Sequence, residues 1–327
     1  MFNTNIKSIL DLLQAFPTEQ HCIDYLENLM WSGTPVSPYN AEHKVYKCAN
    51  NYYKDSVLNK RFNILTGTFM EGTKIPLQKW FIGVWLLTSS KKGLSSVNLA
   101  QQLGITQKSA WFLAHRIRAA FNIENTTDEK FSDISICETD ETFFGGKNKN
   151  RHKDKKVQAS QGRSWKDKTA VTGVLQRGET EIINGKKVQI TNSKVKLRVT
   201  VNTKREVIQP FLKEVVEKHA TLISDEWHGY KGLDNYFDHH VVDHGKKQYV
   251  DYDNPEIHSN SMESFWGIMK RGFNGIYNWW SRKHIHRYCD EFAFRFNTRA
   301  KSNSERFEYL LRNIKVRLKY KQLVLND

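Results

Sequence analysis

Cysteine is scarce in this 327-residue sequence, which has only four, and long apolar runs are missing altogether. The cysteines, Cys22, Cys48, Cys137 and Cys289, lie far apart and form no CxxC pair, so neither a disulfide framework nor an intact zinc module is readable. No segment resembles a signal peptide or could span a bilayer. We therefore expect a cytoplasmic protein in a reducing compartment, with no membrane partner.

Acidic residues are too few to balance the basic ones. The sequence has 35 Asp and Glu against 50 Lys and Arg, which gives a formal net charge of +15. This excess makes a polyanion, nucleic acid above all, the first partner to consider, although it would also suit an acidic membrane surface or an acidic protein. At this length the chain should form two or three modules.

The N-terminal half is predominantly helical in pattern, with a small β-rich segment after the first two helices. Further on, residues 94–121 have the shape of a helix-turn-helix, with a tight turn at Gly104. Its second helix begins after Thr106 and carries Lys108, Arg116 and Arg118. This pattern indicates either DNA binding or an ordinary helical hairpin, and the pattern alone does not decide between them.

From Asp133 onward the periodicity changes to strands, and later strands alternate with helices, which predicts a mixed α/β fold with its ligand site at the strand ends. In the extended segment 134–143, Glu138 and Asp140 share a face that begins apolar, a costly place for a carboxylate without a positive partner. Asp225 likewise ends an apolar strand. Two such aspartates in one sheet would repel each other, and a divalent metal ion relieves that repulsion.

A third carboxylate falls on a predicted helix within "HSNSMESFWGIMKRG". Four apolar residues form one buried stripe on this helix: Met262, Phe265, Trp266 and Met269. Beside the stripe, Glu263 and Lys270 point within about 20° of each other and lie roughly 10 Å apart along the axis. They could supply a metal ligand and a phosphate-binding cation, although a solvated pair flanking a core stripe is the commoner meaning.

A basic tract follows the strand that carries Asp140. Residues 147–168 contain nine Lys or Arg against two Asp. A like-charge run is usually a solvated loop, but contact with a DNA backbone needs no exact geometry, and we favour it here. The DNA-contact candidates are Lys108, Arg116, Arg118, Lys147, Lys149, Arg151, Lys153, Lys155, Lys156 and Arg271. The aromatic residues of "FNGIYNWW" could stack on bases, but core packing suits most of them better.

The blocks "ETDETFFGGK", "SDEWHGY", "HSNSMESFWGIMKRG" and "HIHRYCDEFAFRFNTR" together resemble the catalytic core of the DDE transposases of bacterial insertion sequences, in the group related to Merlin elements. The likeness runs over most of the chain, to about Arg299. It implies a ribonuclease H-like fold in which Asp140, Asp225 and Glu263 are the catalytic, metal-binding triad and Lys270 is the accompanying catalytic lysine. It also implies two Mg²⁺ or Mn²⁺ ions, double-stranded DNA as partner (element terminal repeats and target), and a homo-oligomer as the active complex.

The chain departs from this family before the helix-turn-helix, where relatives commonly carry a zinc ribbon with four cysteine ligands. The corresponding positions here are Ser37, Asn40, Cys48 and Asn51. With one ligand of four left, we predict a degenerate zinc-ribbon-like module without structural zinc. In place of the metal we expect a small aromatic core made by Tyr39, Val45, Tyr46 and Tyr52.

Four segments follow from this interpretation: N-terminal helices and the degenerate ribbon (1–72), the helix-turn-helix region (73–130), a ribonuclease H-like catalytic domain (131–300), and a C-terminal helix (301–327). The expected function is that of a transposase that binds element ends and catalyses metal-dependent DNA cleavage and strand transfer. One alternative is a non-catalytic DNA-binding protein derived from a transposase. Another is an unrelated metal-dependent nuclease of the same fold. The three intact carboxylates favour an enzyme.

Overall fold

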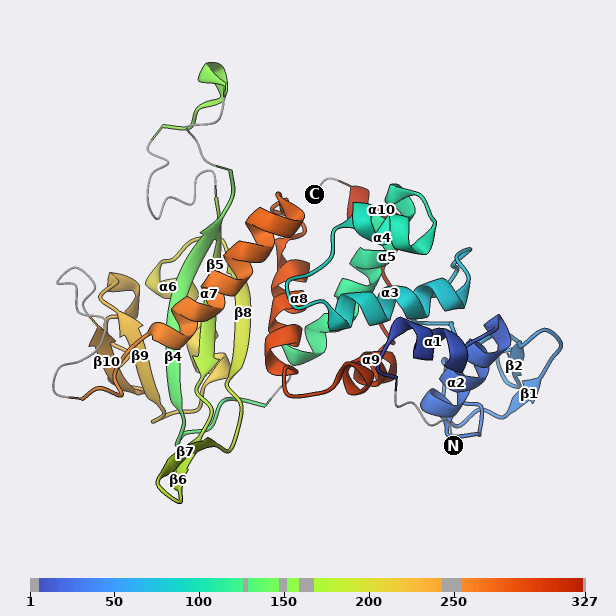
Figure 1. Ribbon diagram of the computed structural model, residues 1–327, viewed down its shortest axis with the longest axis horizontal. Helices are drawn as coiled ribbons and strands as arrows, with labels where there is room; N and C mark the ends of the chain where they lie inside the picture. The colour runs from blue at the N-terminus through green and yellow to red at the C-terminus, as the bar shows by residue number, and fades with distance from the viewer. Residues whose placement is uncertain (1–5, 126–128, 147–151, 159–167, 243–253, 326–327) are drawn as a thin grey trace. The chain divides into compact units, whose positions relative to one another are not determined.

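The chain divides into two compact units, which we describe separately: unit 1 comprises residues 1–121 and 301–327, and unit 2 comprises residues 122–300 (Figure 1). The computed structural model describes residues 6–125, 129–146, 152–158, 168–242 and 254–325. The C-terminal segment, expected to stand alone as 301–327, thus belongs to the same unit as the N-terminal helices. None of the helices described is long and apolar enough to cross a membrane.

Unit 1 consists of helices arranged around one central helix, α3, together with a small antiparallel sheet. Its elements are α1 (Ile9–Ala15), α2 (Glu19–Trp31), β1 (Val45–Lys47), β2 (Tyr53–Asp55), β3 (Arg61–Phe62), α3 (Leu77–Ser89), α4 (Ser96–Leu103), α5 (Gln107–Ala120), α9 (Asn303–Arg312) and α10 (Tyr320–Val324). Helix α3 is apolar on nearly every side because α1, α2, α4, α5 and α9 all pack against it. Gly83 permits the closest of these approaches, since a Cβ there would lie 3.0 Å from Leu113 Cδ2 of α5.

The two helices that the sequence predicts over residues 94–121 are α4 and α5, joined by a turn at Gly104. Gly104 ends α4 in the left-handed conformation, with φ of 57°. The Thr106 hydroxyl then accepts a hydrogen bond from the Ser109 backbone N–H and caps α5. Only the first residues of α5, including Gln107 and Lys108, are exposed, whereas the body of the helix is buried.

The ribbon-like module (β1 to β3) is organised around a buried carboxylate, that of Asp55. The side chain of Asp55 is fully buried and accepts hydrogen bonds from Ser37 Oγ at 2.5 Å, His43 Nδ1 at 2.9 Å, and the backbone N–H groups of Val57 and Leu58. Burial alone would raise the pKa of Asp55, but these hydrogen bonds outweigh it and hold the pKa well below its usual value.

The expected aromatic core is wrong. Three of its members are 42%, 50% and 44% exposed, respectively: Tyr39, Tyr46 and Tyr52. For Tyr52 strand alternation explains the error, because the inward positions of the adjoining strand β2 are Tyr53 and Asp55. The aromatic packing here instead joins Trp31, Tyr53 and Phe62, with ring centroids 5.0 to 6.3 Å apart.

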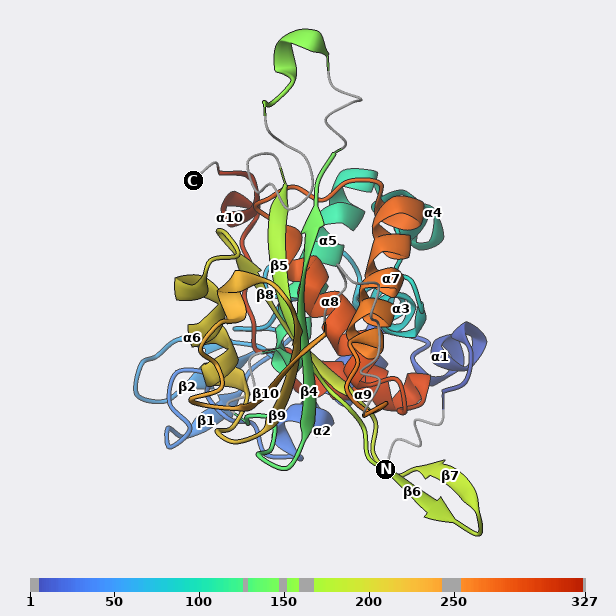
Figure 2. The ribbon, with the colours of Figure 1, turned by 90° about the vertical axis from the view of Figure 1, so that its left-hand side faces the viewer.

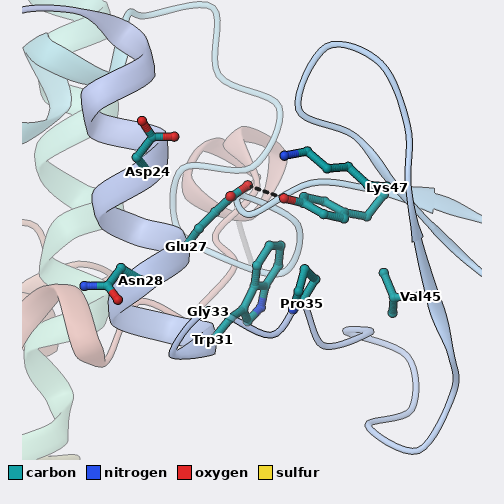
Figure 3. A pocket seen from close by; sticks show the side chains of 9 residues that line it. Asp24, Glu27, Asn28, Trp31, Gly33, Pro35, Val45 and Lys47 are labelled. Carbon is teal, nitrogen blue, oxygen red and sulfur yellow. Dashed lines mark hydrogen bonds between the residues drawn. The ribbon is translucent and has the colours of Figure 1, made fainter.

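A cavity of about 500 Å³ lies between α2 and the β1–β2 strands (Figure 3). Its walls include Asp24, Glu27, Trp31 and Lys47. Inside it the Tyr53 hydroxyl donates to Glu27 Oε1 at 3.0 Å, and burial together with this carboxylate raises the pKa of Tyr53 to about 12. The cavity belongs to unit 1, which does not carry the three predicted catalytic carboxylates.

Unit 2 is a mixed α/β unit. Its main elements are β4 (Ile136–Phe144), β5 (Thr169–Gln176), β6 (Thr180–Ile183), β7 (Lys186–Gln189), β8 (Lys194–Thr200), α6 (Arg205–Val215), β9 (Thr221–Asp225), β10 (Asp238–Val242), α7 (Asn260–Gly272) and α8 (Ile285–Asn297). Five strands form one sheet in the order β10-β9-β4-β5-β8. Strands β10, β9 and β4 run parallel to one another. Strand β5 pairs antiparallel with β4, and β8 pairs antiparallel with β5. Such a sheet is in keeping with the ribonuclease H-like core that the sequence predicts.

Helices cover both faces of this sheet, as Figure 2 shows with α6 on one side and α7 on the other. On one face Val171 and Leu175 of β5 pack against Met262, Trp266 and the other apolar residues of α7 and α8. On the other face Cys137 and Val174 pack against α6. Strand β5 (TAVTGVLQ) is accordingly buried along nearly its whole length, as expected of a strand covered on both faces.

Strand β8 is one of the two edges of the sheet, and two asparagine side chains bond to its backbone at Val195 and Leu197. Asn125 accepts from the Leu197 N–H at 2.6 Å and donates to the Leu197 carbonyl at 2.7 Å. Asn297, at the end of α8, makes the same pair of bonds with Val195 at 2.8 and 3.0 Å. These amides take the place of a further strand and block edge pairing at β8.

Candidate active site

The strand register brings Asp140 and Asp225 to the same place in the sheet. Pairing between β4 and β9 runs from Ile136 opposite Thr221 to Glu138 opposite Ile223. Two residues further on each strand are Asp140 and Asp225, so both aspartates project from the same face. The pairing between the two strands ends at Glu138 and Ile223, and both aspartates lie two residues beyond it, at the carboxyl end of β9.

Helix α7 covers that same face and carries Glu263. Its apolar stripe packs on the sheet, and Phe265, on one flank, contacts Phe296 of α8 with ring centroids 5.1 Å apart. Glu263 and Lys270 share the opposite flank and are exposed. Because α8 lies over β8, this flank faces away from β8, toward the side where β4 and β9 carry their aspartates.

Gly173 allows α7, and with it Glu263, to lie close to the sheet at the level of Asp140. It is the β5 residue directly opposite Asp140. A Cβ on it would lie 2.2 Å from Met262 Cε and 2.9 Å from Trp266 Cζ2. The absence of that side chain lets α7 settle onto the sheet at the level of Asp140, and Glu263 follows Met262 directly in the chain.

A buried carboxylate ties the start of α7 to the sheet. Glu138, which is 0% exposed, accepts from Arg177 Nε at 2.6 Å and from the Met262 backbone N–H at 2.8 Å. The Arg177 guanidinium also donates to the Glu256 carbonyl at 2.5 Å and to His258 Nδ1 at 2.9 Å. Burial, together with Arg177, lowers the pKa of His258, in keeping with a neutral ring that accepts this bond. These contacts fix the chain immediately before Glu263.

Glu141 points away from the three carboxylates, as strand alternation predicts. It accepts a 2.5 Å hydrogen bond from the Tyr230 hydroxyl, and Tyr230 belongs to the core on the α6 face. Burial, followed by the charges of Glu141 and Asp140, raises the pKa of Tyr230 well above its ordinary value. Tyr230 therefore stays protonated and acts as a donor behind β4.

Asp140, Asp225 and Glu263 thus share one face and one end of the sheet, but they do not form a closed ligand set. Among the residues described, no three His, Cys, Asp or Glu side chains lie close enough together to enclose a metal ion. Paired carboxylate oxygens on adjacent strands are the donors that hard divalent cations prefer. The carboxylates of Asp140 and Asp225, with that of Glu263 at an exposed position of α7, are therefore chemically suited to such an ion.

The predicted DNA contacts fall into three groups. Lys108, Lys153, Lys155, Lys156 and Arg271 are exposed. Lys147, Lys149 and Arg151 lie outside the described residues. Arg116 and Arg118 are buried.

The burial of those two arginines is a correction to the sequence prediction. Arg116 and Arg118 are only 5% and 2% exposed. The Arg116 guanidinium donates to the Glu71 carbonyl at 2.6 Å and lies over the rings of Trp80 and Phe112. Burial lowers the pKa of Arg116 to about 10. Arg116 therefore holds α5 in the core of unit 1, where a phosphate backbone does not reach it.

Sequence reasoning missed three residues that build this site: Gly173, Arg177 and Tyr230. The sequence offered a signal for Tyr230, because this residue ends the block "DEWHGY" that begins with Asp225. Gly173 and Arg177 lie in and just after a strand of no distinctive pattern. Their roles depend on which residue of β4 each one faces, and only the register supplies that information.

Residues 135–297 match the ISXO2-like transposase domain. The match begins just before β4 and ends with the last residue of α8, so it contains all three carboxylates. The chain is 24% identical over 275 residues to an uncharacterized protein in transposable element ISH50 of Halobacterium salinarum. This alignment covers 79% of the present chain and 84% of that protein. Residues 135–297 are therefore an ISXO2-like DDE transposase domain.

Proposed function

We propose that this chain is the transposase of an insertion sequence, which binds the ends of its element and catalyses metal-dependent cleavage and strand transfer of DNA. The observation that carries the proposal is the arrangement of Asp140, Asp225 and Glu263 on one face and at one end of a ribonuclease H-like sheet, within an ISXO2-like transposase domain. We infer that the active form is a homo-oligomer on paired DNA ends.

In this proposal Asp140, Asp225 and Glu263 hold Mg²⁺ or Mn²⁺ through carboxylate oxygens. When bound, two such ions activate the attacking oxygen and stabilise the leaving oxygen of a phosphodiester. Lys270 and Arg271 lie on the exposed side of the same helix, where they are suited to bind the phosphates that flank the reacting bond. Glu138 and Arg177 do not react but keep the start of α7, and with it Glu263, in place.

Recognition of the element ends is assigned to unit 1. The exposed start of α5 presents Thr106, Gln107 and Lys108, while the rest of the helix is buried. Recognition helices of this motif contact base edges with their N-terminal residues. Lys153, Lys155 and Lys156 in unit 2 are exposed and add sequence-independent attraction to the backbone.

The test is an incubation of the purified chain with a labelled DNA end of the element, a target plasmid and Mg²⁺. Joined products support the transposase, cleavage without joining supports a nuclease, and binding without cleavage supports a non-catalytic DNA-binding protein. Asp140→Asn should abolish both reactions while end binding persists. The matched control is Asp133→Asn, an exposed aspartate just before β4, which should leave both intact. Joining that survives Asp140→Asn would contradict the assignment.

A further inference from the structure

Strands β6 and β7 form a hairpin that extends beyond the end of the main sheet, between β5 and β8 (Figure 2). The turn is of a kind that favours a hairpin. Asn184 and Gly185 have φ of 52° and 72°, the positive pair typical of a type I′ turn, whose twist matches that of hairpin strands. Among the strands described, β6 and β7 pair only with each other.

The base of the hairpin is stiffened by a second set of contacts. The Gly178 N–H donates to Ser193 Oγ at 3.2 Å, and the Glu179 N–H donates to Thr191 Oγ1 at 2.9 Å. A Cβ on Gly178 would lie 2.2 Å from the Thr191 carbonyl oxygen, so the two chains approach closely there. The hairpin is therefore held in one direction relative to the sheet it leaves.

Its aliphatic side chains face solvent. On one face Ile183 is 45% and Val188 is 38% exposed; on the opposite face Ile182 is 80% exposed, and Ile190, just after β7, is 45% exposed. A lone two-stranded hairpin is marginally stable in water, and exposed apolar residues on a free strand pair normally mark a contact surface. The hairpin therefore lacks a cover within the part of the chain that the structure describes.

The charge of the hairpin indicates what covers it. The whole chain carries a formal charge of +15, whereas residues 178–193 contain Glu179 and Glu181 against Lys186 and Lys187 and are neutral. A neutral hairpin offers a DNA backbone no net electrostatic attraction. Two copies of this basic chain repel each other over most of their surface, and a neutral apolar projection is where they approach at least cost.

One face of the hairpin is complementary to itself. Cross-strand pairing sets Glu181 opposite Val188 and Ile183 opposite Lys186, and these four residues share a face. The acid and the base occupy one diagonal of this array, and the two aliphatic residues occupy the other. A two-fold axis along the aliphatic diagonal would place Ile183 on Ile183 and Val188 on Val188. The same rotation brings each Glu181 close to the Lys186 of the second copy.

We propose that this face of the β6–β7 hairpin packs on the same face of a second copy of the chain, with the two hairpins crossing at a large angle. Contacts of this kind are isologous and close with two copies, and crossed packing of small sheets is a known arrangement. The inference rests on the hairpin alone and stands or falls independently of the proposed catalytic function.

Thiol crosslinking tests the geometry. Facing sheets lie about 10 Å apart, beyond the reach of a disulfide, so a short bifunctional thiol reagent is required. In a Cys48→Ser background, which removes the one cysteine that is not buried, Val188→Cys should yield a crosslinked dimer. Thr180→Cys, on the opposite face, should not. Equal crosslinking of both variants, or of neither, would overturn the proposal.

Charge reversal tests whether the contact is between copies. Glu181→Lys alone and Lys186→Glu alone each create two like-charge contacts per pair of copies and should weaken self-association by on the order of tenfold. A mixture of the two variants should recover wild-type association and Val188→Cys crosslinking, because each variant then supplies the charge that the other lacks. A role within one hairpin cannot produce that recovery. No recovery on mixing, or loss of DNA affinity in place of self-association, would refute the contact.

Discussion

Replacing Gly173 by alanine adds one methyl group where α7 rests on the sheet, opposite Asp140. The new Cβ would lie 2.2 Å from Met262 Cε, 2.9 Å from Trp266 Cζ2 and 3.0 Å from Leu197 Cδ2. The end of the methionine can rotate away, but the indole and the leucine are packed in the core. Overpacking of this kind costs about 1–3 kcal/mol, so the unit should still fold. Relief requires α7 to lift from the sheet and to carry Glu263 with it.

A shift of about 1 Å at a reacting group can cost on the order of 10²-fold in rate. We therefore expect Gly173→Ala to lower the rate of Mg²⁺-dependent cleavage of a labelled element end about 100-fold, with a melting temperature only a few degrees lower. Adding Leu197→Ala removes one of the two packed side chains that the new methyl group meets, so the double variant should cleave faster than Gly173→Ala. A cleavage rate for Gly173→Ala equal to the wild-type rate would refute the view that this glycine sets the position of Glu263.

Four further predictions concern parts of the chain that do not react. Glu138→Gln places an amide against two donors, the Arg177 guanidinium and the Met262 N–H. It should weaken Mn²⁺ binding, measured by calorimetry, about 10- to 100-fold while the fold persists. An unchanged Mn²⁺ affinity would show that Glu138 does not position Glu263. Because the pKa of Asp55 is lowered in the folded state, its contribution to stability is complete above the ordinary carboxyl pKa and is lost as pH falls below about 4. Asp55→Asn should remove that part of the acid dependence in urea unfolding, and a wild-type slope would contradict this. Arg116→Met should lower the melting temperature with little change in the salt dependence of end binding. Lys108→Ala should instead reduce the slope of the logarithm of affinity against the logarithm of salt concentration by about one. The reverse pattern would identify Arg116 as a DNA contact. Metal analysis of the purified chain should find no zinc, and one equivalent per chain would refute the degenerate-ribbon prediction.

Those features that depend on periodicity could be predicted from the sequence. The alternation along β4 correctly separates Asp140 from Glu141, and the structure gives Glu141 a partner on the opposite face. The stripe on α7 correctly assigns Met262 to the core and Glu263 to an exposed flank. Both results follow from local geometry, since a strand repeats every two residues and a helix about every 3.6.

Features that depend on long-range pairing could not be predicted in this way. The basic residues of α5 suggested DNA contacts, but Arg116 and Arg118 turn inward because α5 packs between other helices along most of its length. Lys108 escapes burial because it stands in the first turn of that helix. The prediction of an aromatic core in the ribbon-like module failed for a related reason. No local pattern shows that Asp55 accepts four hydrogen bonds from residues up to 18 positions away.

Glu263 differs from the two aspartates in how its position is set. Asp140 and Asp225 are placed by hydrogen bonding between β4 and β9, which is continuous up to two residues before them. Glu263 stands on a helix whose height depends on Gly173 and whose start is held by Glu138. A displaced α7 would leave the two aspartates in place and remove the third carboxylate from them. Variation at positions 138 and 173 should therefore affect catalysis through Glu263 alone, and pairing Glu138→Gln with Glu263→Ala should cost no more than Glu263→Ala by itself.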